Sequence, residues 1–132
     1  MNSFFPALFT ALLISTAAVA DNIQTKRVQF KEGANSATVE STIKGYQSID
    51  YVLRANKGQA MNVSMATDNS SNYFNIIPPE ESDVAIFVGS MSGNQYEGIL
   101  PKSGDYTVRV YLMRNAARRD EVANYRLEMI ID

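Results

Sequence analysis

Short runs of alternating apolar and polar residues recur roughly every ten residues, and clusters of Gly, Asn, Pro, Ser and Asp separate them. Clear examples are IDYVLRA, AMNVSMAT, YTVRVYLM and NYRLEMII. No apolar pattern with the 3.6-residue period of a helix is sustained over ten residues. Alternation with period 2 is typical of half-buried antiparallel strands. The sequence therefore predicts an all-β fold, an antiparallel β-sandwich of jelly-roll-like form with about eight strands.

The alternation also assigns side chains to the two faces of each strand. In the run that ends near residue 112, one face carries Val108, Val110 and Leu112, and the other carries Arg109 and Tyr111. In the last run, one face carries Tyr125, Leu127, Met129 and Ile131. These two apolar faces are predicted to lie in the core of the sandwich.

The first twenty residues differ in composition from the rest of the chain. They contain no charged side chain and end in Ala18-Val19-Ala20, which resembles a signal peptide with its cleavage site near Ala20. A membrane anchor is the alternative, but the apolar run is short for a bilayer span and contains Pro6. We therefore expect residues 1–20 to be a cleaved signal peptide and residues 21–132 a single periplasmic domain with no membrane attachment.

The composition excludes several classes of function. The chain has no cysteine, so in an oxidising compartment the fold must be stable without disulfides. It has no histidine, which removes the commonest general base and the commonest metal ligand. A net charge of −2 argues against non-specific binding to nucleic acid or anionic lipid. We expect a protein that is not an enzyme, with no catalytic residues, no cofactor and no resident metal.

Three arginines lie close together in YLMRNAARRDE: Arg114, Arg118 and Arg119. The segment joins two predicted strands and is long for a hairpin connection, and NAARRDE is compatible with one helical turn. One interpretation is a solvated loop in which Arg118 and Arg119 pair with Asp120 and Glu121. The other is a binding edge for carboxylates or phosphates, which guanidinium groups recognise bidentately.

Three further stretches are weaker candidates. SGDY, from Ser103 to Tyr106, forms either a plain turn or a small polar tip that enters a cleft. Tyr46 follows Gly45 at a strand boundary and is either an interface anchor or a partly buried edge residue. TDNSSN contains Asp68, but one carboxylate is few for a calcium site, and a turn is the favoured interpretation.

A family resemblance appears in YLMRNAARR, LPKSGDYTVRVY, DYVLRANKGQAMNVSM and YFNIIPPE. Together these segments resemble the periplasmic inhibitors of goose-type (g-type) lysozyme, and the likeness extends over residues 21–132. Some of the segments are also similar, more loosely, to exported β-sandwich accessory domains of secreted peptidases. The resemblance implies an antiparallel β-sandwich that occludes the lysozyme's substrate cleft with loops at one end.

The resemblance also implies which residues contact the target, g-type lysozyme. Arg114 is the first candidate for a cation that enters the cleft, beside Asn115. Arg118 and Arg119 follow, and one of them is a candidate for holding the loop. Ser103 and Gly104 match the family's second loop, which the resemblance implies is a neighbour of the arginine loop. Tyr46 matches an aromatic contact after a glycine.

A second class of function remains open, an exported module that binds carbohydrate or peptidoglycan. Its signature would be a flat stripe of aromatic rings, for which the candidates are Tyr51, Tyr96 and Tyr111. Homodimer formation also stays open, because no feature of the sequence decides it.

Overall fold

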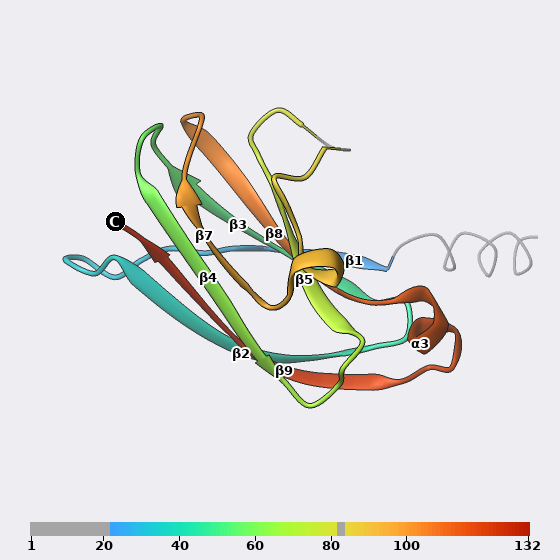
Figure 1. Cartoon of the computed structure of the whole chain (residues 1–132). Coiled ribbons are helices and arrows are strands. Elements are labelled where there is room, and N and C mark those ends of the chain that lie inside the picture. Colours follow the sequence, from blue (N-terminus) through green and yellow to red (C-terminus); the bar gives the residue numbers. More distant parts are fainter. Residues whose placement is uncertain (1–21, 82–83) are drawn as a thin grey trace, which may run out of the picture.

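The computed structural model describes residues 22–81 and 84–132, which form two β-sheets packed face to face (Figure 1). One sheet has five strands in the order β1-β3-β8-β5-β6, with bounds Ile23–Arg27, Ser48–Ala55, Gly104–Leu112, Asn72–Ile77 and Phe87–Val88. The other has four strands in the order β2-β9-β4-β7, with bounds Ser36–Lys44, Val122–Ile131, Ala60–Thr67 and Gln95–Ile99. Two short helices lie in connections, α2 (Gly89–Ser92) and α3 (Arg114–Arg118). The all-β sandwich predicted from the alternation is thus confirmed.

One pairing departs from the antiparallel expectation. β1 pairs with β3 in parallel, with Ile23 opposite Ser48 and Arg27 opposite Val52. The chain enters along the edge of the five-stranded sheet and then crosses to the other sheet as β2, so β1 and β3 run in the same direction. The parallel pair places the start of β1 at the same end of the sandwich as the β2–β3 turn.

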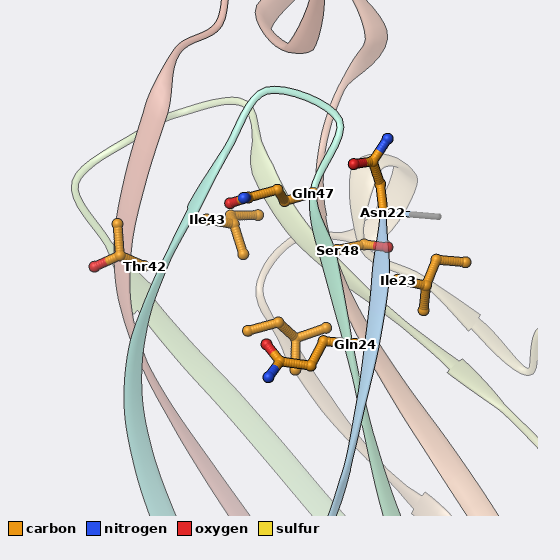
Figure 2. Close-up of a pocket in the computed structure, with 8 residues that line it drawn as sticks. Asn22, Ile23, Gln24, Thr42, Ile43, Gln47 and Ser48 are labelled. Carbon is orange, nitrogen blue, oxygen red and sulfur yellow. The ribbon is translucent and has the colours of Figure 1, made fainter. Parts of the chain in front are cut away.

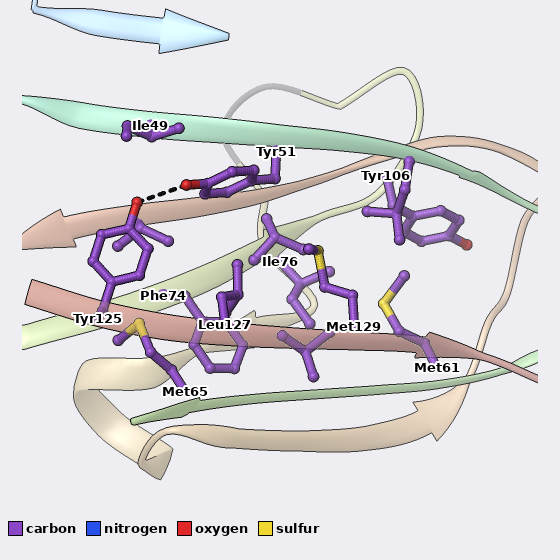
Figure 3. Close-up of a cluster of buried hydrophobic side chains, with 14 of the residues drawn as sticks. Ile49, Tyr51, Met61, Met65, Phe74, Ile76, Tyr106, Tyr125, Leu127 and Met129 are labelled. Atoms are coloured by element: carbon purple, nitrogen blue, oxygen red, sulfur yellow. Dashed lines mark hydrogen bonds between the residues drawn. The ribbon is translucent and has the colours of Figure 1, made fainter. Parts of the chain in front are cut away.

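The alternation assigned the core faces correctly. Val108 and Val110 are fully buried, and Leu112 is nearly so. The four apolar residues of β9 are buried as well: Tyr125, Leu127, Met129 and Ile131. Figure 3 shows the side chains of Tyr125, Leu127 and Met129 between the sheets, together with those of Phe74 and Ile76. This packing makes a rigid scaffold without a disulfide.

A tyrosine pair crosses this core. The hydroxyl groups of Tyr51 on β3 and Tyr125 on β9 lie 2.8 Å apart in a hydrogen bond (Figure 3). Burial, and then the bond to Tyr51, raises the pKa of the Tyr125 hydroxyl. The buried position of Tyr51 corrects one expectation, because a ring that is 2% exposed cannot belong to a surface stripe for carbohydrate.

The remaining two aromatic candidates do not form such a stripe either. Tyr96 is half-buried, and its ring packs against Phe87 with the centroids 5.3 Å apart. Tyr111 lies in the other sheet, where its hydroxyl donates to Asn75 Oδ1 at 3.0 Å.

The polar residues of the five-stranded sheet include one well-made ion pair. Arg109 and Asp50 are in register on β8 and β3. Nε and Nη2 of Arg109 donate to the two oxygens of Asp50 at 2.7 and 2.9 Å. The bidentate bond raises the pKa of Arg109 against the opposing effect of burial. This pair accounts for one arginine of the chain as a structural residue.

Within the described ranges, no helix is long and apolar enough to cross a membrane. The predicted signal peptide, residues 1–20, lies outside the described residues.

Candidate functional site

The β8–β9 connection contains the helical turn expected for NAARRDE. α3 spans Arg114–Arg118, and its inward face is formed by Ala116 and Ala117, which are 0% and 1% exposed. Alanine favours helix and leaves room for close approach to the sandwich. The side chains of the other α3 residues, Arg114, Asn115 and Arg118, are exposed. The order of small and cationic residues in the sequence therefore directs the arginines to solvent.

Glu121 fastens this connection to the two neighbouring loops. Its carboxylate accepts hydrogen bonds from Asn69 Nδ2 at 3.0 Å and from Arg119 Nε at 2.8 Å. These bonds, with that from Asn69 the larger, hold the pKa of Glu121 below its usual value. The carbonyl oxygen of Glu121 accepts the N–H of Gly45 at 2.9 Å. One residue thus joins the β2–β3, β4–β5 and β8–β9 connections.

The three arginines divide into two kinds. Arg119 forms an ion pair with Glu121, with Nη2 and Oε2 2.6 Å apart. No ion pair joins Arg114 or Arg118 to a carboxylate in residues 22–81 and 84–132. Of the two pairings expected for a solvated loop, the described residues contain the one between Arg119 and Glu121 but none for Arg118, which is exposed. Arg114 and Arg118 are both exposed.

Tyr46 lies beside this arginine loop. Its turn is held by Gly45, which has φ +61° and approaches the end of the α3 segment so closely that a Cβ would lie 2.6 Å from Asp120 Oδ1. The Tyr46 side chain is 56% exposed. In Figure 1 the β2–β3 turn and α3 lie at the same end of the sandwich. We call Tyr46, Arg114, Asn115, Arg118 and Arg119 the cationic end.

Two apolar side chains at this end were not among the candidates from the sequence. Met113 and Val122 flank the connection and are 37% and 47% exposed. The alternation could have identified both residues. Met113 follows the buried Leu112 and Val122 precedes the buried Ala123, so both side chains are expected to point outward. Exposed apolar groups around a cation are the usual composition of the centre of a protein–protein interface.

A polar pocket lies just below the Tyr46 turn, between β1 and β2 (Figure 2). Its volume is about 220 Å³, and it is lined by three amide side chains, two hydroxyl side chains and three isoleucines: Asn22, Gln24, Gln47, Thr42, Ser48, Ile23, Ile43 and Ile49. Two of the polar groups have partners already, since Gln47 Oε1 accepts from the N–H of Lys44 and Thr42 Oγ1 donates to Asn124. The pocket carries no charge.

Ser103 and Gly104 are not at the cationic end. Ser103 and Gly104 lie at the start of β8, whereas Arg114 lies just beyond its end. A strand of nine residues spans about 27 Å. The expectation that the Ser-Gly loop neighbours the arginine loop is therefore wrong. The cause is that both loops adjoin one strand, at its two ends.

The SGDY segment has a structural role at the opposite end. Ser103 Oγ accepts the N–H of Lys57 at 2.8 Å, which links the β7–β8 and β3–β4 turns. Gly104 has φ +141° and faces Pro79, 2.9 Å from where a Cβ would be. The hydroxyl of Tyr106 donates to the carbonyl of Lys102 at 2.7 Å. These contacts correspond to the plain-turn interpretation.

Asp68 also belongs to a turn. Asn124 donates to both of its carboxylate oxygens, from the backbone at 2.9 Å and from the side chain at 2.8 Å. The side-chain bond is the larger cause that lowers the pKa of Asp68. In the part of the chain that the structure describes, no three Asp or Glu residues gather in a group suited to a metal ion.

The fold and the cationic end together define a class of molecule: a small two-sheet β-sandwich that displays exposed guanidinium groups on a loop at one end. Comparison with known proteins then gives the family. The inhibitor of g-type lysozyme from Escherichia coli strain K12 is 34% identical over 127 residues, which cover 94% of this chain and 92% of that protein. The chain belongs to the family of inhibitors of g-type lysozyme. No protein-family model matches it.

Solved structures agree with this family. The chain is similar to Aeromonas hydrophila PliG, a periplasmic inhibitor of g-type lysozyme, with 38% identity, a TM-score of 0.78, and coverage of 86% of this chain and 100% of that one. It is also similar to Salmonella Typhimurium PliG, with 32% identity, a TM-score of 0.65, and coverage of 83% and 98%. The pre-peptidase C-terminal domain of a Bacillus anthracis collagenase has a TM-score of 0.54 at 13% identity, which shows a likeness of fold alone.

Proposed function

We propose that this protein is a periplasmic inhibitor of g-type lysozyme and that its cationic end occludes the enzyme's substrate cleft. The observation that carries the proposal is the pair of exposed guanidinium groups, on Arg114 and Arg118, which have no carboxylate partner in the described residues. Enzymes that hydrolyse glycosidic bonds generally use carboxylic acids in their clefts. An arginine that reaches such acids gains charge-assisted hydrogen bonds and displaces the water or sugar required for the reaction.

The scaffold supports this role through rigidity. Hydrogen bonds of Glu121 hold the connection in one arrangement before any partner arrives. Little ordering entropy is then lost on binding, which is the main benefit of a pre-organised interface. Tyr46 adds a large contact area at low entropic cost. In this proposal Arg119 positions the loop, whereas Arg114 and Arg118 enter the cleft.

The geometry separates Ser103 and Gly104 from this contact surface, so we do not include them in it. We further propose that residues 21–132 form the active inhibitor after cleavage near Ala20, and that the protein binds the enzyme without catalysing a reaction. The lack of histidine and cysteine supports the latter point.

The test is inhibition of purified g-, c- and i-type lysozymes by the protein isolated from a periplasmic extract. We expect inhibition of the g-type enzyme and a 1:1 complex in analytical ultracentrifugation, with an interface of about 1,600 Å² in total. Absence of g-type inhibition would contradict the proposal. A parallel pull-down on purified peptidoglycan without lysozyme tests the carbohydrate-binding alternative, which strong retention would favour.

Gly45→Ala tests whether the two loops of the cationic end act as one unit. Alanine in the left-handed region costs about 1 kcal/mol, and its Cβ would also push against Asp120. We expect lower stability together with a severalfold rise in the inhibition constant, because the β2–β3 turn moves away from α3. Thermal unfolding and inhibition assays measure the two effects.

Gly58→Ala is the matched control for this substitution. Gly58 has φ +90° in the turn at the opposite end, with no atom within 4 Å of the added Cβ. It carries a similar backbone cost but should leave inhibition unchanged. Equal loss of inhibition in the two variants would mean that stability alone, and not loop placement, is responsible.

A further inference from the structure

The sandwich is closed along one side and open along the other. At the closed side, the rings of Phe87 on β6 and Tyr96 on β7 bridge the two sheets. At the open side, the edge strands β1 and β2 flank a groove of about 540 Å³. Both strands can be followed in Figure 1, in blue and cyan. We call this cavity the β1–β2 groove.

The groove has an apolar interior. Its apolar lining comes from both sheets and the segment between β1 and β2: Val28, Ala34, Ala37, Val39 and Tyr51. Val28 and Val39 are only partly buried and pack against the core from its margin. Apolar surface of this kind remains in contact with water unless a ligand covers it.

Cations line the same groove. Lys26 is opposite Tyr51 in the parallel pairing, so its side chain leaves the same face of the sheet, and it is exposed like the other residues of β1. Lys31 lines the groove from the β1–β2 connection, and neither lysine takes part in an ion pair within the described ranges. Arg27 also borders it but is paired with Asp105 at 3.0 Å.

No carboxylate is among the groove's lining residues. The nearest acids along these segments, Glu32 and Glu40, are exposed and lie outside the lining. The lining thus carries Lys26 and Lys31 without a lining carboxylate, while Arg27 is neutralised by Asp105, on a protein whose net charge is −2. Its volume lies within the usual range of small-molecule sites, about 300–1,000 Å³.

We propose that the β1–β2 groove binds an anionic amphiphile, a molecule with one acyl chain and a carboxylate or phosphate head. The chain would cover the partly buried side chains of Val28, Ala37 and Val39. The head would lie between the ammonium groups of Lys26 and Lys31, which favour such anions. The groove adjoins the half of β2 around residues 36–39, away from the Tyr46 turn, so this binding is independent of the proposed lysozyme contact.

The test is titration of the protein purified from the periplasm with decyl phosphate and with decanoate, followed by calorimetry and by NMR chemical shifts. We expect saturable binding with a dissociation constant on the order of 100 µM. The shift changes should concentrate at Lys26, Val39 and Tyr51. Inorganic phosphate, decanol and decyltrimethylammonium should bind at least tenfold more weakly.

The double variant Lys26→Gln/Lys31→Gln should weaken decyl phosphate binding at least tenfold and leave lysozyme inhibition unchanged. Lys102→Gln/Arg126→Gln is the matched control, because it removes the same charge from exposed positions outside the groove and should leave amphiphile binding unchanged. The proposal would be overturned if decanol or inorganic phosphate bound as tightly as decyl phosphate. It would also be overturned if both double variants lost the same amount of decyl phosphate affinity, or if the chemical-shift changes were centred on the cationic end.

Discussion

Arg114→Ala is expected to raise the inhibition constant for g-type lysozyme about thirtyfold. Arg114 is exposed and belongs to no ion pair of the described residues, so its removal costs the free protein little. A guanidinium group desolvated against a carboxylate of the partner is worth about 2 kcal/mol or more, which corresponds to the thirtyfold change. The same group in open solvent contributes below about 1 kcal/mol. Steady-state inhibition kinetics measure the effect.

Two further variants locate the effect on the cationic end. Arg126→Ala removes an exposed arginine from the outward face of β9 and should change the inhibition constant by less than twofold. Arg114→Ala/Arg118→Ala should raise it more than a hundredfold if both cations enter the cleft. A change of less than twofold for Arg114→Ala would show that Arg114 is not the key cation, even with inhibition itself intact.

Phe74→Ala should lower the free energy of unfolding by about 4 kcal/mol. Phe74 is fully buried between the sheets (Figure 3). Its ring centroid lies 5.2 Å from that of Phe87. The loss combines the transfer energy of the ring with the cavity left behind. For a domain of this size the midpoint of thermal unfolding should fall by roughly 15–30 °C. Calorimetry measures both quantities.

Phe87→Ala is the comparison for this variant. The Phe87 ring is only partly buried, so its removal should cost about 1–2 kcal/mol. At a temperature where Phe74→Ala is still folded, the inhibition per folded molecule of this variant should match that of the unchanged protein, because the Phe74 side chain is buried in the core and is not part of the cationic end. A cost for Phe74→Ala no greater than that for Phe87→Ala would contradict the packing described for this core.

Much of the fold was predictable because its signal is local. The inward faces of β8 and β9 followed from alternation, since a strand directs successive side chains to opposite faces. The helical turn at NAARRDE followed from two alanines among polar residues. The outward direction of Met113 was available by the same logic, although it was not among the candidates.

The candidate site was predictable only in part. The sequence left two interpretations open for the arginine loop, and pairing of Arg119 with Glu121 belonged to one of them. In the structure Glu121 is also held by a hydrogen bond from Asn69, which is 52 residues away in the chain. The aromatic stripe failed because Tyr51 faces a partner in the opposite sheet, Tyr125. Contacts between residues so far apart in the chain produce no periodic pattern in the sequence.

By itself, the sequence determined the alternation of faces, the composition of the arginine loop and the family. Only the tertiary structure decided which loops share an end of the sandwich, that β1 lies parallel to β3, and that an open side with two lysines lies between β1 and β2. The physical reason is that periodicity specifies the direction of a side chain from its strand, whereas the pairing of strands depends on packing between residues far apart in the chain. Tyr46 thus meets the arginine loop through Gly45 and Glu121, and Ser103 is held a full strand length away.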